Sequence, residues 1–246
     1  MSKLLSVVIP VYNSANSLEK LFESLQREIS SLEDQYELIF VDDGSRDGSR
    51  KILQEISANN RQTVTVIFLA ENFGQQNAIM AGLRRAAGEY IVTMDDDLQH
   101  DPADIGLLRL KAEEGYELVY GIPKSKQHHY FRGWGTLLTD LFFTVFLRKN
   151  KSIKISSFRI MRQNLKEKIV EDKGSFVYIS AIALRHTSNI AVVETNHQRS
   201  ARGHSSYTVL KLVRLYLNLF FNYSGLFKQN KEGEQYRIAE IIPREQ

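Results

Sequence analysis

The stretch YIVTMDDDLQHDP, residues 90–102, joins a run of mostly apolar residues directly to three adjacent aspartates at 95–97. A second stretch, YELIFVDDGSRDGS at 36–49, has the same form, because an apolar run leads into two aspartates at 42–43 and then a glycine turn. Adjacent carboxylates repel one another and add nothing to the stability of a fold by themselves. Two strands that end in acidic clusters therefore indicate a site that binds a positive group.

Apolar runs and helical patterns alternate around these two stretches. Strands are predicted at 4–9, 36–41, 64–69, 90–94 and 117–121, and helices at 18–29, 47–58, 75–88 and 102–115. This alternation favours an α/β fold with a mostly parallel sheet and helices on both of its faces. Ligands of such sheets bind at the carboxyl ends of the strands. Since both acidic clusters follow strand ends, we expect them on one rim.

The composition sets the broad class of protein. The chain has 246 residues, 43% of them apolar, which is enough for one large domain or somewhat more. Its net charge of +3 is too small to indicate a nucleic-acid partner, and the absence of cysteine excludes disulfides and cysteine-ligated zinc. We see no signal peptide and no run of about 18 uncharged apolar residues. These features predict a cytoplasmic protein without membrane-spanning helices.

The pattern changes after residue 121. Two apolar helices with narrow polar stripes are predicted at 133–147 and 206–222, and the segment from 228 onward is polar, so we expect it to be loosely held. We therefore divide the chain into an α/β half at 1–121 that holds the acidic clusters, a half with the two apolar helices at 122–227 and a tail at 228–246. The apolar faces of the two helices have two interpretations: each packs on the domain or on a second subunit, or each makes peripheral contact with the cytoplasmic face of a membrane.

The acidic triplet suits a hard divalent cation. Mg²⁺ and Mn²⁺ prefer oxygen ligands and commonly combine one or two carboxylates with phosphate oxygens of a substrate. In an extended loop, Asp95 and Asp97 point roughly the same way and Asp96 points the opposite way. Helix capping is the structural alternative, and it fits Asp101 and Asp47 best.

Other enzymes that handle phosphate differ from this sequence to different degrees. The chain has no G-x-x-x-x-G-K-[ST] loop and no G-x-G-x-x-G after a strand, which argues against a P-loop enzyme and a dinucleotide-binding domain. A phosphatase with an aspartyl nucleophile also begins with a strand that ends in D-x-D, and it is the main chemical rival. It needs a lysine and a further acidic pair beyond the sheet, of which we find no convincing set.

The chain resembles the family 2 glycosyltransferases with the GT-A fold in four motifs that follow the same order. These are SVVIPVYNSANSLEKLFESL (6–25), YELIFVDDGSRDGS (36–49), ENFGQQNAIMAGLRRAAGEYIVTMDDDLQHDPADI (71–105) and SSFRIM (156–161). The stretch DDDLQHDP makes it most similar to the branch of dolichyl-phosphate mannose synthases and bacterial polyprenyl-phosphate glycosyltransferases. The resemblance covers residues 4–224, and it implies a GT-A fold, a nucleotide-sugar donor and Mg²⁺ or Mn²⁺ as cofactor.

The resemblance also implies roles for individual residues. Nucleotide-sugar-binding positions are Pro10, Tyr12, Asn13, Asp42, Asp43, Gly44, Gln75, Asp95 and Asp96, and metal-binding positions are Asp95, Asp97 and Gln99. Acceptor-binding positions are Lys124, Arg159, Arg199, Arg202 and Ser205. Catalytic positions are Asp97, Asp95 and Arg159.

Three departures bear on the acceptor. Members of this branch often have an arginine after the fifth strand where this chain has Lys124, an aspartate before the F-R pair where it has Ile153, and a lysine near the end of the last motif where it has Ser206. These differences weaken the inference of a polyprenyl-phosphate acceptor and leave the donor site untouched. Lysine still binds phosphate, but as a point charge without the fork of arginine.

The function that follows is a metal-dependent inverting glycosyltransferase. It is expected to move a sugar from a nucleotide sugar to a lipid-linked acceptor in the synthesis of a cell-envelope polysaccharide. Transfer to a soluble or protein-linked sugar is one alternative, and a non-catalytic, membrane-associated binding module is another. The sequence leaves open the sugar, the nucleotide, the base that a hydroxyl acceptor would need, and whether the protein is a homo-oligomer.

Overall fold

The computed structural model describes residues 4–31, 35–124, 143–144, 153–196, 209–224 and 231–245. In these segments one sheet of eight strands has the order β7-β5-β6-β4-β1-β2-β3-β8. The strands are β1 (Leu5–Val11), β2 (Tyr36–Asp42), β3 (Val64–Leu69), β4 (Tyr90–Thr93), β5 (Leu118–Pro123), β6 (Arg159–Arg162), β7 (Ile190–Thr195) and β8 (Ile238–Ile242). The helices are α1 (Ala15–Ser30), α2 (Ser49–Asn59), α3 (Gln75–Arg85), α4 (Ile105–Glu113), α6 (Gln163–Val170), α7 (Ile179–His186) and α8 (Val209–Tyr223), with a short 3-10 turn at Pro102–Asp104.

The sheet is mostly parallel, as the sequence predicts. Strand β1 pairs in parallel with β2 and β4, β2 with β3, and β5 with β7. Strand β6 runs antiparallel between β4 and β5, and β8 runs antiparallel to β3 at the sheet edge. The expected α/β fold class is therefore confirmed, with two antiparallel strands added to it.

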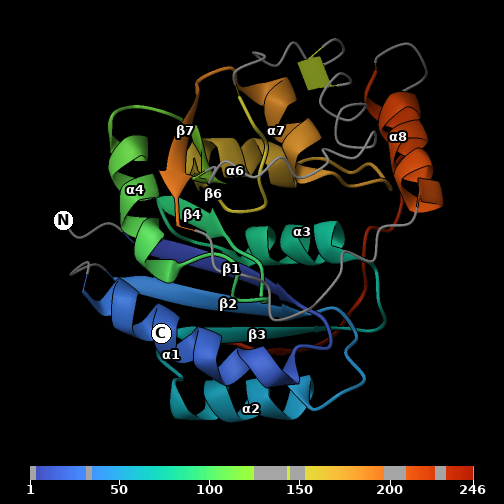
Figure 1. Ribbon diagram of the computed structural model, residues 1–246. Helices are drawn as coiled ribbons and strands as arrows, with labels where there is room; N and C mark the ends of the chain where they lie inside the picture. Colours follow the sequence, from blue (N-terminus) through green and yellow to red (C-terminus); the bar gives the residue numbers. More distant parts are fainter. Residues whose placement is uncertain are drawn as a thin grey trace.

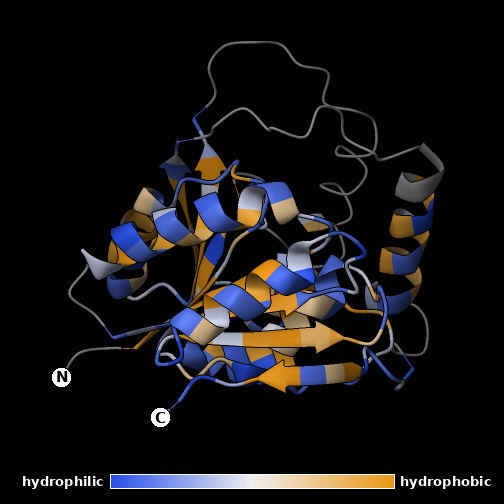
Figure 2. Ribbon diagram, turned by 90° about the horizontal axis from the view of Figure 1, so that it is seen from below, coloured by the Kyte–Doolittle hydropathy of each residue, from blue (hydrophilic) through white to orange (hydrophobic). Residues whose placement is uncertain are grey.

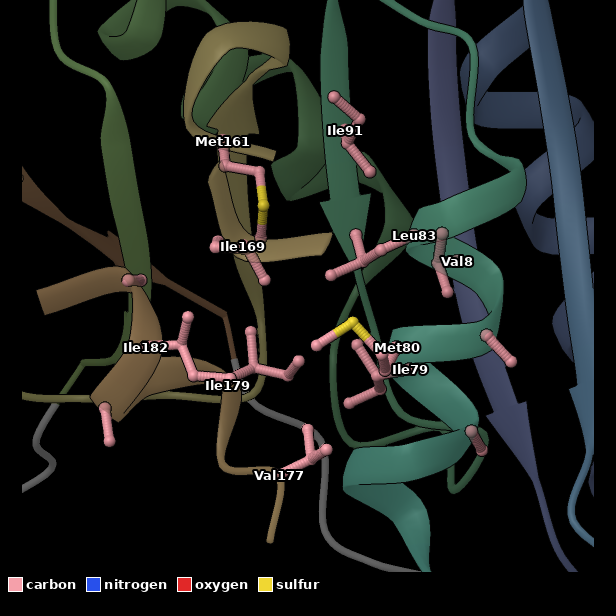
Figure 3. Packing of buried hydrophobic residues seen from close by; sticks show 14 of the residues in the cluster. Val8, Ile79, Met80, Leu83, Ile91, Met161, Ile169, Val177, Ile179 and Ile182 are labelled. Atoms are coloured by element: carbon pink, nitrogen blue, oxygen red, sulfur yellow. The ribbon is translucent and has the colours of Figure 1, made fainter. Parts of the chain in front are cut away.

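Helices cover both faces of the sheet, and each face has its own hydrophobic core (Figure 1). Helices α1, α2 and α4 bury their apolar residues on one face, together with side chains such as Phe40 and Phe68. Helices α3, α6 and α7 cover the other face, where Met80 and Met161 pack beside Ile179 (Figure 3). Because both faces are covered, the parallel strands read as continuous apolar runs, which is why their sequences predicted them well.

Residue Gly82 explains how closely α3 approaches the sheet. A Cβ atom at this position would lie 2.3 Å from Cγ1 of Val8 and 3.1 Å from Cγ2 of Val41. Such distances are below van der Waals contact, so only glycine permits this packing. The close approach sets the position of the first residues of α3, which reach the rim where the acidic clusters lie.

The C-terminal segment differs from the expectation. Residues 228–246 were expected to form a loosely held tail, and this is wrong for 238–242, which form β8 on β3. Four ion pairs tie this segment to the domain: Glu240 with Arg50, Arg237 with Glu71, Glu245 with Arg61, and Arg244 with Glu37. The sequence signal was missed because the strand is short and polar residues surround it. The division at 121 and 227 stays a prediction.

The two predicted amphipathic helices have different outcomes. Helix α8 confirms the helix expected at 206–222, and its Leu219 and Tyr223 pack into the core beside α7. Of the helix expected at 133–147, the structure describes only Phe143 and Thr144, which are helical, and Phe143 is buried. Among the described segments, no helix has both the length and the apolar character that crossing a membrane requires.

Candidate active site

The carboxyl ends of the parallel strands place the sequence-predicted residues on one rim. Strand β1 leads into Tyr12, β2 ends at Asp42, β4 leads into the acidic triplet, and β5 leads into Lys124. Strand β6 is antiparallel, so its first residue, Arg159, lies at the same rim beside Thr93. The expectation that both acidic clusters lie at one edge of the sheet is confirmed.

The acidic triplet does not act as a uniform group. Asp96 is buried, with 7% of its surface exposed, and its carboxylate accepts a hydrogen bond from the backbone N–H of Tyr12 at 3.2 Å and another from the hydroxyl of Ser14. Its backbone oxygen accepts from the hydroxyl of Ser17 at 2.9 Å. Asp96 therefore fixes the β1–α1 loop, and it faces away from the positions of its two acidic neighbours, as strand alternation predicts.

Asp95 is held by two side chains from different parts of the fold. Gln75 Nε2, at the first residue of α3, donates to Asp95 Oδ1 at 2.6 Å. Ser157 Oγ, in the segment before β6, donates to Asp95 Oδ2 at 2.6 Å. Each carboxylate oxygen has two lone pairs, so these bonds leave acceptor capacity on both oxygens. The structure thus brings the predicted Gln75 and Asp95 together and adds Ser157, which the site prediction had omitted.

Asp97 is paired with its neighbour in the turn. Its Oδ1 accepts from the backbone N–H of Gln99 at 3.1 Å, and its Oδ2 accepts from Gln99 Nε2 at 2.6 Å. Between them Leu98 has a φ of 63°, in the left-handed region that costs a side chain about 1 kcal/mol or more. This turn keeps Asp97 and Gln99 together at the partly exposed mouth of the rim.

A pocket of about 230 Å³ lies beside the acidic triplet, between the loops that follow β1, β2 and β3. Its lining residues are Tyr12, Asp42, Gly44, Ser45, Arg46, Arg50, Leu69, Ala70, Glu71 and Asn72. A flat ring of the size of a nucleobase fits such a volume, and the lining offers hydrogen-bond donors and acceptors of both charges. Of the residues expected to bind nucleotide sugar, Tyr12, Asp42 and Gly44 line this pocket.

Asp42 and Asp43 are adjacent in the sequence but have different hydrogen-bond partners. Asp43 Oδ1 accepts from the backbone N–H of Phe73 at 2.7 Å, and its Oδ2 accepts from that of Gly74 at 2.9 Å. Asp43 therefore anchors the β3–α3 loop, while Asp42 lines the pocket and accepts from Ser45 N at 3.2 Å. Burial raises the pKa of Asp42 above its ordinary value, and burial raises the pKa of Asp43 to about 6.

Two further residues from the prediction shape the loops around the pocket. Gly44 has a φ of 71°, and a Cβ there would lie 2.7 Å from the backbone carbonyl carbon of Glu71, so only glycine lets these two loops touch. Asn13 joins the β1–α1 and β2–α2 loops, because its N–H donates to Ser45 Oγ at 2.9 Å and its Oδ1 accepts from Arg46 N at 2.8 Å. Both positions serve the geometry of the pocket. Pro10 lies within β1.

The two expected capping aspartates do bind helix starts. Asp101 Oδ1 accepts from Ala103 N at 3.1 Å, at the beginning of the 3-10 turn. Asp47 accepts from Ala15 N at 3.1 Å and from Ser49 N at 2.9 Å, which are the first residues of α1 and α2. These bonds give both aspartates the structural role of a cap.

Residues expected to face the acceptor lie partly outside the described segments. Lys124 is exposed at the end of β5, and its N–H donates to Thr195 O at 3.0 Å. Arg159 lies below the surface with 1% exposed, and its guanidinium contacts Thr93 and Ser180. Arg199, Arg202 and Ser205 lie outside the described residues.

Asp95, Asp97 and the side chains beside them supply some of the oxygen ligands that a divalent cation requires. Two partly exposed carboxylates and the amide of Gln99 offer oxygen atoms at one mouth of the rim, and the diphosphate of a bound donor would offer more. Within the part of the chain that the structure describes, no group of three or more acidic, histidine or cysteine side chains is arranged to hold a metal ion. The donor set therefore fits a cation that shares its ligands with a substrate.

Several residues of the site were not among the predicted ones. The hydroxyl groups of Ser14, Ser17 and Ser157 bind the acidic triplet, and Thr93 and Ser180 bind Arg159. Serine and threonine carry little sequence signal, because they are common in loops and strands alike. Ser157 had the strongest indication, since it stands in the SSFRIM motif.

Comparisons with known proteins agree with this geometry. The model of the family "Glycosyl transferase family 2" matches residues 6–186. An undecaprenyl-phosphate 4-deoxy-4-formamido-L-arabinose transferase from Proteus mirabilis is 34% identical over 214 residues, which cover 87% of this chain and 66% of that relative. The chain thus spans about two thirds of the length of this curated relative.

Two solved structures share the fold. A glucosyl-3-phosphoglycerate synthase from Mycobacterium tuberculosis, in complex with Mn²⁺, UDP and glucosyl-3-phosphoglycerate, has a TM-score of 0.66 at 17% identity, over 98% of this chain and 90% of that one. A mannosyltransferase from Pyrobaculum calidifontis, with GDP-Man and Mn²⁺, has a TM-score of 0.59 at 17% identity, over 83% and 59%. Because the family model matches more than half of its residues, the chain belongs to glycosyl transferase family 2.

Proposed function

We propose that the protein transfers a sugar from a nucleotide sugar to a lipid-linked phosphate acceptor, with inversion at the anomeric carbon. The observation that carries this proposal is the common rim, where a pocket of nucleobase size lies between the loops after β1, β2 and β3 and two partly exposed carboxylates, Asp95 and Asp97, follow the neighbouring strand β4. The name of the Proteus mirabilis relative supports a polyprenyl-phosphate acceptor.

The donor end of the reaction uses the pocket between the three loops. Tyr12 and Asp42 would contact the base or ribose, and Arg46 or Arg50 adds positive charge for the phosphates. Helix α3 begins at Gln75 beside Asp95, so its free N–H groups and positive dipole end lie near the diphosphate. The sugar would then lie over the rim between Gln75 and the acceptor side.

A divalent cation, Mg²⁺ or Mn²⁺, would be held by Asp95 and Asp97, with Gln99 close by. When bound, it supplies positive charge that stabilises the departing nucleoside diphosphate. The chain's own residues do the rest: Gln75 and Ser157 fix the Asp95 carboxylate, Gln99 fixes Asp97, and the pocket holds the nucleoside. Both solved neighbours bind Mn²⁺ together with a nucleotide or nucleotide sugar.

The acceptor would approach from the side of β5 and β7. Lys124 stands exposed at the end of β5, so a phosphate group there would meet positive charge. A phosphate oxygen is already ionised at neutral pH and needs no general base before it attacks the anomeric carbon. This chemistry explains how the reaction can proceed without a dedicated catalytic base.

We propose that the exposed apolar face of α8 brings the protein to a membrane surface. Val213, Leu217 and Phe221 follow one another at intervals of four, are between 46% and 50% exposed, and have Arg214 beside them. The opposite face of α8 packs on the core through Leu219. A helix of this kind can lie in the interface with its apolar side chains in the lipid.

The donor and acceptor are tested together by measuring the release of nucleoside diphosphate. UDP-, GDP- and dTDP-sugars are each incubated with the protein and Mn²⁺, with undecaprenyl phosphate, with a soluble sugar, or with no acceptor. We expect one donor to be consumed, and undecaprenyl phosphate to accelerate its consumption. Acceleration by the soluble sugar alone would favour a soluble acceptor, and binding of a nucleotide sugar without turnover on any acceptor would favour a binding module.

A further inference from the structure

Arg159 is an unusual residue for the interior of a protein. Its side chain is among the largest that are fully buried, with 1% exposed. Its Nε donates to Thr93 Oγ1 at 3.0 Å and its Nη1 donates to Ser180 Oγ at 2.7 Å, and no carboxylate of the described segments forms an ion pair with it. A buried charge without a counter-ion is costly, so its placement calls for negative charge close by.

The hydrogen bonds continue from Arg159 to the rim. The hydroxyl of Thr93, which accepts from Arg159, donates to the backbone oxygen of Ser157 at 2.6 Å. The hydroxyl of Ser157 then donates to Asp95 Oδ2 at 2.6 Å. The two bonds at Ser157 involve different groups, because its backbone oxygen accepts from Thr93 while its hydroxyl donates to Asp95. Arg159 and Thr93 therefore hold the main chain of Ser157 in place, and the side chain of Ser157 holds Asp95. The nearest acidic group along this chain is therefore Asp95.

The chain of contacts also connects separate elements. Thr93 is the last residue of β4, Arg159 is the first residue of β6, and Ser180 lies in α7. All three are buried within the sheet and its covering helix, so they form a rigid support. Ser157 alone is partly exposed, and it stands between this support and Asp95.

We propose that Ser157 and Thr93 are positioning residues for the Asp95 carboxylate: Ser157 holds it in the orientation that the divalent cation requires, and Thr93, supported by Arg159, fixes the backbone of Ser157. The proposal rests on the proposed role of Asp95 in metal binding. Gln75 fixes the other oxygen of the same carboxylate, so loss of the Ser157 bond frees one side of it. Hydrogen-bond partners of metal-binding carboxylates commonly change metal affinity by about 10-fold to 100-fold.

The main test compares two neighbouring serines. Ser157→Ala removes the bond to Asp95, while Ser156→Ala removes a hydroxyl that accepts only from Phe158 N at 3.2 Å. The probe is Mn²⁺ alone, titrated into the full chain and followed by the electron paramagnetic resonance signal of the free ion. We expect Ser157→Ala to raise the Kd for Mn²⁺ by about 10-fold. We expect Ser156→Ala to stay within about twofold of wild type, with thermal unfolding of both variants recorded alongside.

A second pair of variants tests whether the hydroxyl of Thr93 contributes to Mn²⁺ binding. Thr93→Val keeps the shape of the side chain and removes the hydroxyl, whereas Thr93→Ser keeps the hydroxyl. We expect Thr93→Val to weaken Mn²⁺ binding as Ser157→Ala does, and Thr93→Ser to bind like wild type. Thr65 is the matched control, because it is a buried threonine on β3 whose hydroxyl accepts from Arg244 N at 3.2 Å, away from the rim. Thr65→Val should leave the Mn²⁺ affinity unchanged.

The outcomes separate this proposal from the proposed function. A wild type and Ser157→Ala with the same Kd for Mn²⁺ would overturn the positioning role and leave the metal site intact. Equal losses in Ser156→Ala and Ser157→Ala would overturn it as well, because the effect would then be a general one on the loop. If the wild-type protein does not bind Mn²⁺ more tightly than Asp97→Asn does, both the proposed metal site and this inference are overturned. If Thr93→Val does not fold, the comparison of Ser157→Ala with Ser156→Ala decides whether the positioning role holds.

Discussion

At the scale of single residues, the members of the acidic triplet lie in different surroundings. The Asp96 carboxylate is buried against the β1–α1 loop, while Asp95 and Asp97 are partly exposed at the mouth of the rim. The residue type does not distinguish these positions, because all three are aspartates. Their hydrogen-bond partners distinguish them, and substitutions should therefore separate a structural effect from a catalytic one.

The first prediction compares Asp97→Asn with Asp96→Asn. Asp97→Asn should abolish turnover with little change in the free energy of unfolding, because a neutral amide cannot supply the anionic oxygen that the cation needs. Asp96→Asn should instead lower the free energy of unfolding by about 1.5–3 kcal/mol, since its charge accepts hydrogen bonds from Tyr12 and Ser14. Urea denaturation and donor turnover measure the two effects. Near wild-type activity of Asp97→Asn at saturating Mn²⁺ would contradict the assignment.

The second prediction concerns the acidic pair at the end of β2. Asp42→Ala should weaken binding of the nucleoside diphosphate by about tenfold or more, the effect of a lost charged hydrogen bond worth about 1.5–3 kcal/mol. Asp43→Ala should destabilise the fold by about 2 kcal/mol, because it leaves the N–H groups of Phe73 and Gly74 without a partner. Calorimetric titration and denaturation distinguish them. Unchanged nucleotide affinity in Asp42→Ala would place the nucleotide elsewhere.

The third prediction uses the pKa of Asp43. Burial raises it from an ordinary value of 3.8 to about 6 in the folded protein. Between these two values the folded state binds more protons than the unfolded state, so the stability that Asp43 contributes falls as the pH rises through this window. The free energy of unfolding of wild type, measured relative to that of Asp43→Asn, should therefore fall from pH 4 to pH 6.5 and then level off. A difference that is constant over this range would contradict the raised pKa.

At the scale of secondary structure, β8 depends on contacts that only the folded chain provides. Its short sequence, flanked by polar residues, pairs with β3 over a long sequence separation, from Leu69 with Ile238 to Val66 with Ile242. The segment after β8 places Arg244 Nε at 3.1 Å from Glu37 Oε2, and the Glu37 side chain is only 3% exposed. Glu37 also accepts from Ser6 Oγ at 2.6 Å and Ala87 N at 2.8 Å. A C-terminal arginine thus compensates a charge that is buried at the start of β2.

The fourth prediction compares two ion pairs of this segment. Arg244→Met keeps the aliphatic packing and removes the charge beside Glu37, so it should lower the free energy of unfolding by about 2 kcal/mol, less than for a fully buried pair because Arg244 is partly exposed. Arg61→Met breaks the pair with Glu245, whose two side chains are both exposed, and should cost less than about 1 kcal/mol. Chemical denaturation measures both. Equal effects would mean that burial of Glu37 has no part in holding the C-terminal segment.

The sequence predicted the elements whose own residues determine them. Strands β1 to β5 are continuous apolar runs, and α1 repeats its apolar residues at helical spacing, so local pattern sufficed. Strands β6, β7 and β8 were not predicted, because all three pair with strands distant in the sequence, and RIMR and IAEII also have mixed polarity. Helices α6 and α7 were not predicted either. The rim followed from topology. The different roles of Asp42 and Asp43 could not be predicted, because they depend on the hydrogen bond between Asp43 and the loop at Phe73.

At the scale of the whole molecule, donor and acceptor sides share one sheet. The nucleotide pocket lies at the ends of β1, β2 and β3, and Lys124 lies at the end of β5. Helix α8 stands at the side of the domain, and Figure 2 shows apolar residues along it as orange bands between polar ones. Its Leu219 and Tyr223 are buried in the core, and Leu215, Tyr216 and Phe220 are partly buried against it. Val213, Leu217 and Phe221 remain exposed. An acceptor carried by a lipid would require such a surface.

The fifth prediction tests whether α8 binds lipid. The wild-type protein should sediment with vesicles of phosphatidylcholine and phosphatidylglycerol at low salt, and less so at high salt, because screening weakens the attraction between basic residues such as Arg214 and anionic headgroups. Leu217→Glu with Phe221→Glu should reduce sedimentation and preserve nucleotide binding, since both side chains are exposed and far from the pocket lining.

A matched control exists on another face of the domain. Leu107 and Leu110 of α4 are 46% and 63% exposed, close to or above the exposure of Leu217 and Phe221, so Leu107→Glu with Leu110→Glu introduces the same charge on apolar surface of the same kind. If membrane contact belongs to α8, the α4 double variant sediments like wild type. Equal losses in both double variants would show that sedimentation reflects net charge alone. A wild-type protein that stays in the supernatant at low salt would contradict the membrane contact and favour an acceptor that is free in solution.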